Sequence, residues 1–223
     1  MSLHIELAPQ HKSGLYLRNP VIMASGTFGY GVEYARIAEI HRLGAIVCNS
    51  ISLHARDGVA QSGLQEAAAG LLSSFERPDP GVHKVLKKYS SLWASWHTPV
   101  IANLAGTSCE EFAELAARLE GSPGIAALEI NLVCPNSAAD GVSFGSDPGA
   151  VEQLIGDVRE QTTLPLIAKL APFNGDLRSI AMAAVSAGAD ALSLVHSFPG
   201  LSIDPHTRRP LLSGGLCGPA IKP

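Results

Sequence analysis

The residues best placed to do chemistry follow the apolar stretch 125–130, where Asn131 and Cys134 stand three positions apart. A cysteine thiol with a lowered pKa could remove a proton from a substrate. The amide of Asn131 offers a donor and an acceptor, which suits the edge of a lactam or a flavin ring. Each residue also has a simpler interpretation, because a lone cysteine is more often a small buried hydrophobe and asparagine is a common turn former.

Polar or reactive residues also stand at the ends of most of the other apolar stretches. Six stretches have the character of buried parallel strands, and they cover residues 19–26, 45–50, 99–104, 125–131, 164–170 and 189–195. The second to sixth end in or beside Asn49, Asn103, Asn131, Lys169 and His196. Active groups of α/β barrels lie at the carboxyl ends of their strands, so these residues in chain order predict one shared site.

Helical segments alternate with these strands. We predict helices at residues 34–40, 82–89, 108–119, 147–162 and 177–187. We predict a short strand or hairpin at residues 4–17, a long irregular segment at 51–80, and a polar loop after Ser197. The alternation predicts an α/β fold, a TIM (β/α)8-type barrel, in a single domain over residues 1–223.

The barrel is predicted to be incomplete. A closed barrel of this type has eight strand–helix units, and six strands are predicted here. The last two units would carry loops that often hold a phosphate group. We therefore expect a truncated chain with a curved, open sheet, unpaired outer sides on the first and sixth strands, and a tendency to form homo-oligomers.

Composition excludes several other classes of protein. Of the 223 residues, 46% are hydrophobic and 16% are charged, and the net charge of −4 gives no electrostatic case for nucleic acid. The four cysteines are widely spaced, which favours free thiols over disulfides, and no metal-ligand spacing is visible. No apolar run has the length of a membrane span or a signal peptide, so a cytoplasmic protein is expected.

Two specific motifs and three supporting segments carry a family resemblance. The motifs are the cysteine loop 129–136 and the glycine-rich segment 214–223, and the supporting segments are 19–31, 144–148 and 169–172. Together they resemble the class 1 dihydroorotate dehydrogenases. The similarity is greater to the subclass whose catalytic chain pairs with an iron–sulfur and FAD electron-transfer subunit.

The resemblance implies an enzyme of pyrimidine biosynthesis that oxidises dihydroorotate to orotate on FMN. Cys134 would remove the C5 proton while hydride leaves C6 for flavin N5, and Lys169 would face the N1/O2 side of the flavin, where negative charge develops. The implied cofactor-binding residues are Ser25, Asn49, Ser50, Asn103, Asn131, Lys169, Val195 and Gly218. The implied substrate-binding residues are Asn49, Ser73, Arg77, Asn131, His196 and Ser197. Without the phosphate-holding loops, the chain is expected to bind FMN poorly on its own.

The chain departs from the family pattern in the substrate-binding shell. Asn49 stands where the family usually carries a lysine, and Ser73 stands where it usually carries an asparagine. Glu76 replaces a glycine, beside Arg77, which could compensate for the added carboxylate. His196-Ser197 replaces an asparagine–threonine pair. These four changes predict an altered substrate or a lost activity.

Two other functions remain open at this stage. One is a flavoenzyme acting on another dihydropyrimidine or cyclic amide. The other is a non-catalytic barrel relative that binds a ligand or a partner chain. For Lys169, a salt-bridged barrel lysine and a Schiff-base lysine are the alternatives to a flavin-binding lysine.

Overall fold

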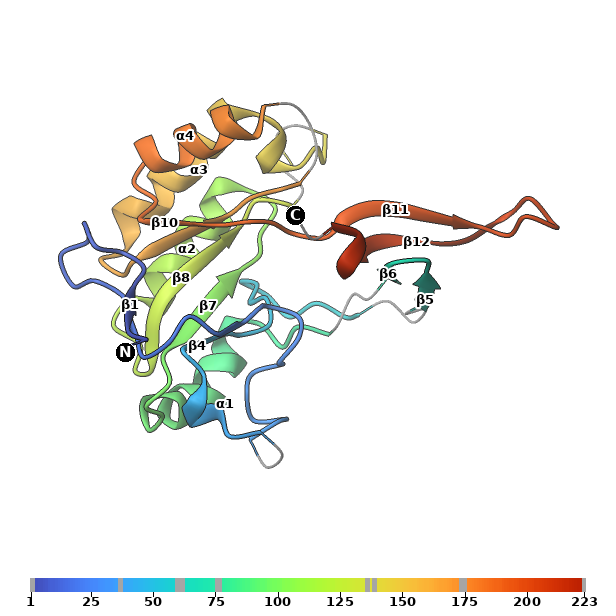
Figure 1. Ribbon diagram of the computed structural model, residues 1–223. Coiled ribbons are helices and arrows are strands. Elements are labelled where there is room, and N and C mark those ends of the chain that lie inside the picture. The colour runs from blue at the N-terminus through green and yellow to red at the C-terminus, as the bar shows by residue number, and fades with distance from the viewer. Residues whose placement is uncertain are drawn as a thin grey trace.

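A six-stranded parallel sheet forms the centre of the molecule (Figure 1). The computed structural model describes residues 3–35, 38–58, 63–74, 78–134, 137, 140–172 and 176–221. The strands are β3 (Ile22–Met23), β4 (Ala45–Val47), β7 (Val100–Leu104), β8 (Ile125–Asn131), β9 (Leu166–Lys169) and β10 (Ala191–Ser193). Their order is β10-β9-β8-β7-β4-β3, so all six predicted strands are confirmed as neighbours in chain order.

The sheet is curled and open, as predicted for an incomplete barrel. Within the described residues, β3 pairs only with β4, and β10 pairs only with β9. The fold is therefore that of an incomplete TIM barrel, with six parallel strands in its sheet.

The two faces of the sheet have separate cores, because successive side chains of a strand point to opposite faces. The outer face packs against the helices through residues such as Leu104, Leu128 and Ile130. The inner face carries Ile101, Ala127 and Ile167. An N-terminal hairpin of β1 (Ile5–Glu6) and β2 (Tyr16–Leu17) adds three buried side chains to the inner cluster: Ala8, Leu15 and Leu17.

Four α-helices cover the outer face: α1 (Val82–Ala94), α2 (Cys109–Leu119), α3 (Pro148–Gln161) and α4 (Leu177–Ser186). The predicted N-cap is confirmed, since the Ser108 hydroxyl accepts a hydrogen bond from the Glu111 backbone N–H at 3.3 Å. Helix α1 extends beyond its predicted end because Trp93 is buried and its Nε1 donates to the Tyr30 carbonyl at 3.0 Å. Among the described residues, no helix has the length and apolar character needed to cross a membrane.

The helix predicted at residues 34–40 is wrong. Residues 32–35 form a turn, Ile40–Arg42 form the 3-10 helix η1, and residues 36–37 lie outside the described part of the chain. Seven residues are too few for a stable helix without strong packing. Tyr34 instead stacks on Phe28, with ring centroids 4.7 Å apart.

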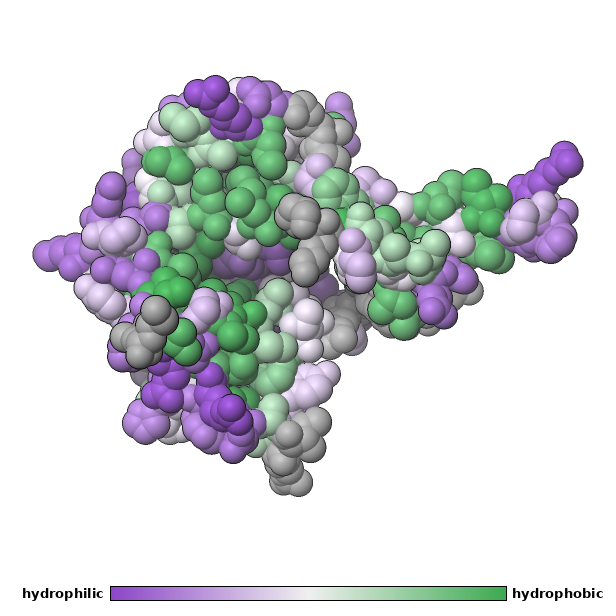
Figure 2. Space-filling view, viewed as in Figure 1, coloured by the Kyte–Doolittle hydropathy of each residue, from purple (hydrophilic) through white to green (hydrophobic). Residues whose placement is uncertain are grey.

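A second, antiparallel sheet corrects the predictions for residues 51–80 and for the loop after Ser197. Its strands are β5 (Gly63–Ala67), β6 (Gly70–Ser74), β11 (Phe198–Ile203) and β12 (Pro210–Cys217), in the order β11-β12-β6-β5. This sheet projects from the barrel as an arm (Figure 1). Apolar surface lies along the arm and polar residues at its tip (Figure 2). Glycine and proline within β11 and β12 weakened the strand pattern, and the pairing of Leu72 with Leu216 is remote in sequence.

Candidate functional site

A line of polar contacts crosses four neighbouring strands at the inner face of the barrel. The Ser50 hydroxyl donates to Asn103 Oδ1 at 2.6 Å, and Asn103 Nδ2 donates to Glu129 Oε2 at 2.6 Å. Lys169 Nζ lies 3.9 Å from the same carboxylate oxygen. The line therefore runs from the end of β4 through β7 and β8 to β9 and ends in a cation.

Strand register explains why these side chains meet. Asn103 is paired with Glu129 across β7 and β8, and Asn131 with Lys169 across β8 and β9. All four residues face inward, like Ile101 and Ile167 below them. Asn103, Glu129 and Lys169 are at most 8% exposed. Polar groups so deeply buried are costly unless they are paired, which this line of contacts provides.

Asn49 and Asn131 flank the line but differ in what their amides do. Asn49 Oδ1 is buried without a hydrogen-bond partner among the residues that the structure describes. Asn131 Oδ1 accepts from the Val133 backbone N–H at 3.3 Å, which is the turn-forming alternative weighed from the sequence. The Asn49 oxygen is therefore the acceptor best placed to receive a donor from a bound ligand.

Cys134 lies in a separate setting, on the loop after β8. Its backbone N–H donates to the Asn131 carbonyl at 3.2 Å, and its carbonyl accepts from Phe144 N at 3.1 Å. Burial raises the pKa of the Cys134 thiol from 9.0 to about 11, although a hydrogen bond with the Gly106 backbone and the charge of Arg56 lower it. The lowered pKa that would favour a base is therefore not present in this conformation.

The charged pair beside Cys134 acts on its thiol in opposite directions. Arg56 Nη2 lies 3.7 Å from Glu111 Oε2. Arg56 lowers the pKa of Cys134, whereas Glu111 raises it. Glu111 is held in place because Oε2 accepts from the Thr107 backbone N–H at 2.6 Å and from its hydroxyl at 3.0 Å.

Ser73, His196 and Ser197 meet where the arm leaves the barrel. Ser197 Oγ is 3.0 Å from His196 Nδ1. Ser197 also packs closely on Gly215, which is paired with Ser73 in the antiparallel sheet. Burial lowers the pKa of His196, and the positive charge of Lys169 lowers it further, so the imidazole is neutral at pH 7. The structure thus brings three of the predicted substrate residues together.

The remaining predicted residues are more dispersed. Ser25 follows β3 and is half-buried, next to Gly26, whose surroundings leave open space. Val195 packs against the outer core. Gly218 lies against Gly70 at the base of the arm. Arg77, like Glu76, lies outside the described residues.

The inner-face residues fit a flat, conjugated ring such as a flavin. The ring edge needs both donors and acceptors, which the Asn103 amide and the Asn49 oxygen, unpaired within the described part of the chain, can supply. Lys169 supplies a buried cation, and the open space beside Gly26 leaves room for a close approach to the backbone. These are the residues that would hold the ring.

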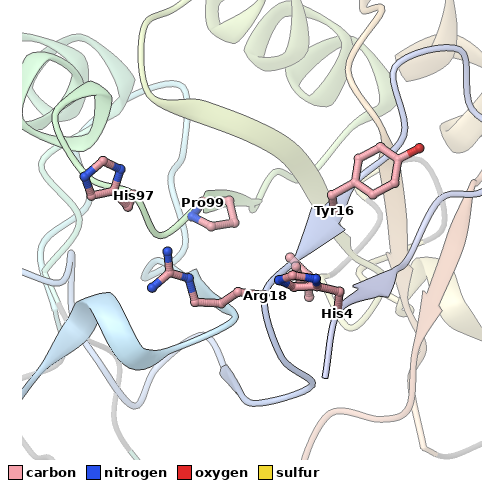
Figure 3. A pocket seen from close by; sticks show the side chains of 6 residues that line it. His4, Tyr16, Arg18, His97 and Pro99 are labelled. Carbon is pink, nitrogen blue, oxygen red and sulfur yellow. The ribbon is translucent and has the colours of Figure 1, made fainter. Parts of the chain in front are cut away.

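One pocket lies between the N-terminal hairpin and the segment that precedes β7 (Figure 3). Its lining residues are His4, Tyr16, Leu17, Arg18, His97 and Pro99. Pro99 directly precedes β7, so this pocket is at the amino ends of the strands, whereas Asn103 and Lys169 stand at the carboxyl ends. Active groups of barrels lie at the carboxyl ends, so this pocket is not the candidate site.

Comparison with known proteins agrees with this fold. The profile of the family described as Dihydroorotate dehydrogenase matches residues 8–223. The chain belongs to the dihydroorotate dehydrogenase family. It is therefore a member of a family of oxidoreductases whose cofactor is a flavin, and the fold and the family predicted from the sequence are both confirmed.

Individual relatives are similar over most of the chain. A protein of Desulforudis audaxviator is 45% identical over 214 residues, covering 95% of this chain and 70% of the relative. A protein of Citrifermentans bemidjiense is 41% identical over the same shares of the two chains. A protein of Geobacter metallireducens is 41% identical over 99% of this chain and 72% of the relative. Each is named dihydroorotate dehydrogenase B (NAD(+)), catalytic subunit.

Sequence reasoning missed two residues of the site. Glu129 carries a charge in the middle of a buried strand and stands two positions before Asn131, so it shares the inward face. That signal was available in the sequence. Arg56 gave no such signal, because it lies in the irregular segment and approaches Glu111 only through tertiary folding.

Proposed function

We propose that the chain oxidises dihydroorotate to orotate with FMN as the electron acceptor, a reaction of pyrimidine biosynthesis. The observation that carries the proposal is the buried line from Ser50 to Lys169, which ends in a cation at the carboxyl end of the barrel strands. Two further points support the same function: the chain belongs to a family of flavin-using enzymes, and its inner-face residues fit the edge of a flavin ring.

The inner-face residues would bind and orient the ring. FMN, when bound, supplies the acceptor for the hydride that leaves C6 of the substrate. The Lys169 ammonium would stabilise the negative charge that develops at the N1/O2 side. Asn103 would present an amide whose orientation is fixed at both ends, by Ser50 and by Glu129. Ser25, Asn49, Ser50, Asn131, Val195 and Gly218 complete the proposed cofactor-binding set.

Cys134 is the proposed base that takes the C5 proton on its sulfur. With a pKa of about 11, the thiol is protonated at neutral pH in the free chain. A thiolate is the form that accepts a proton, so Cys134 must lose its own proton before or during substrate binding. The nearby Arg56 guanidinium favours that ionised form, because it lowers the pKa of the thiol.

The substrate would be held by Asn49, Ser73, Asn131, His196 and Ser197, together with Arg77. A neutral His196 can donate one hydrogen bond and accept another, but it adds no positive charge for a carboxylated substrate. Asn49 likewise offers no charge in place of the family lysine. These two observations favour a second candidate, a flavoenzyme acting on an uncharged dihydropyrimidine or cyclic amide.

A partner subunit and an assembly are part of the proposal. The relatives are named as catalytic subunits of an NAD(+)-dependent enzyme. We therefore propose that an iron–sulfur and FAD subunit takes the electrons from FMN. A cytoplasmic homo-oligomer, built through the apolar arm, fits the exposed Leu201, Ile203 and Leu211.

Anaerobic reduction of the FMN-loaded protein tests the function directly. Dihydroorotate should bleach the flavin absorbance, and an uncharged dihydropyrimidine serves as the competing substrate. Faster bleaching by the uncharged compound would favour the second candidate. If neither compound reduces the flavin, or if no FMN binds after reconstitution, the proposed function is wrong.

A further inference from the structure

Glu129 contacts both Asn103 and Lys169, and it thereby connects the two ends of the line of polar contacts. Its Oε2 accepts from Asn103 Nδ2 at 2.6 Å and lies 3.9 Å from Lys169 Nζ. The side chain of Glu129 is 4% exposed and that of Lys169 is 10% exposed. One carboxylate oxygen therefore faces both groups that are proposed to meet the flavin ring.

The two contacts differ in kind. The bond from Asn103 is short and charge-assisted, so it fixes which end of the amide faces the carboxylate. Ser50 fixes the other end by donating to Asn103 Oδ1. An amide turned the other way would bring its oxygen against the carboxylate, and that repulsion keeps the observed orientation.

The separation of Lys169 from Glu129 is too long for a hydrogen bond, which needs about 2.7–3.2 Å. Glu129 therefore offsets the charge of Lys169 without occupying its donors. Lys169 Nζ donates no hydrogen bond to any residue that the structure describes. As far as the described residues are concerned, its ammonium N–H groups stay available for a ring atom, and its buried charge is still compensated.

We propose that Glu129 is a positioning residue that fixes Asn103 and moderates the charge of Lys169, and thereby sets the reduction potential of the bound flavin. This inference rests on the proposed function, because it assumes that the ring meets Lys169. A cation stabilises the reduced ring, and a carboxylate beside that cation opposes the effect. Glu129 thus makes the flavin harder to reduce than Lys169 alone would.

The flavin arm of the test is a potential measurement on the FMN-loaded full chain. Glu129→Gln should shift the midpoint potential to a more positive value, with at least a tenfold change in the reduction equilibrium, or about 30 mV for two electrons. Lys169→Met should shift it to a more negative value. Glu120→Gln is the matched control, since Glu120 accepts from Thr162 and Thr163 and is not part of the line, and the potential should not move.

The second arm needs no flavin. Unfolding by denaturant is measured for Glu129→Gln, Lys169→Met and the double variant, which buries no charge at either position. A coupled pair should make the double variant more stable than the sum of the single changes, by roughly two- to a hundredfold in the folding equilibrium. Additive effects would show that the pair is not coupled.

The outcomes separate the inference from the proposed function. A parent that binds no FMN, or whose FMN dihydroorotate does not reduce, contradicts the proposed function, and the unfolding cycle then decides the pairing alone. A parent that works, with a Glu129→Gln potential equal to or below that of the parent, overturns the inference. Additive unfolding effects overturn it as well, whatever the flavin does.

Discussion

The contact between Gly215 and Ser197 offers a sharp test of how the arm meets the barrel. A Cβ added at Gly215 would lie 2.2 Å from Ser197 Oγ and 2.8 Å from Ser197 Cβ. The φ of Gly215 is not among the positive values recorded for the chain, so alanine adopts this backbone conformation without strain. The substitution Gly215→Ala therefore acts through the clash alone.

The expected cost has two parts. Forcing a methyl group into a filled space costs about 1–3 kcal/mol. Moving Ser197 also breaks its 3.0 Å contact with His196 Nδ1, and a neutral hydrogen bond contributes about 0.5–1.5 kcal/mol. We expect Gly215→Ala to lower the free energy of unfolding by about 1.5–4.5 kcal/mol if both terms apply in full.

Denaturant unfolding measures this change, and two further variants make it specific. In the double variant Gly215→Ala with Ser197→Gly, both clashing atoms are gone, so most of the lost stability should return. Gly156→Ala is the control, because nothing lies within 4 Å of a Cβ at this helical position. It should stabilise the protein by about 0.5–1 kcal/mol. A Gly215→Ala protein as stable as the parent, or a loss that Ser197→Gly leaves untouched, would refute the reasoning.

Three further predictions concern the thiols and the substrate shell. In anaerobic stopped-flow at neutral pH, the Cys134→Ser variant should reduce bound FMN far more slowly than the parent does. The rate of the parent should rise toward pH 11, where the Cys134 thiol ionises. A parent rate that does not change with pH would contradict the assignment of Cys134 as the base. Burial raises the pKa of Cys134 to about 11 and of Cys48 to about 12, so the folded state holds protons that the unfolded state releases. The stability that the two protonated thiols contribute is complete below pH 9 and is lost progressively up to about pH 12. Denaturant unfolding across that range measures the loss. The variant Cys48→Ala should show a weaker dependence of stability on pH. The double variant Asn49→Lys with Ser73→Asn should bind dihydroorotate roughly ten- to a hundredfold more tightly, because a charged hydrogen bond contributes about 1.5–3 kcal/mol. An unchanged affinity in calorimetry, with the variant folded, would argue against a role of these two positions in substrate binding.

The sequence alone determined the parallel sheet and most of its helices. Apolar runs such as 99–104 and 125–131 are local signals, because a strand covered on both faces needs apolar residues at nearly every position. Ser108 marked a helix start through a side-chain bond that spans three residues. The strand ends carried their polar residues in chain order, so Asn103 and Lys169 were predicted to share one site, although Glu129 between them was missed.

Only the tertiary structure decided what those residues contact. The arm depends on pairs such as Leu72 with Leu216, whose stability comes from a partner far along the chain and not from local preference. The raised pKa of Cys134 comes from burial on a loop. The Asn131 amide oxygen accepts from Val133, whereas the Asn49 oxygen finds no partner among the residues that the structure describes. Residue type fixes what chemistry a side chain can do, but its neighbours fix its charge, its orientation and its free donors, and most of those neighbours are brought together only by folding.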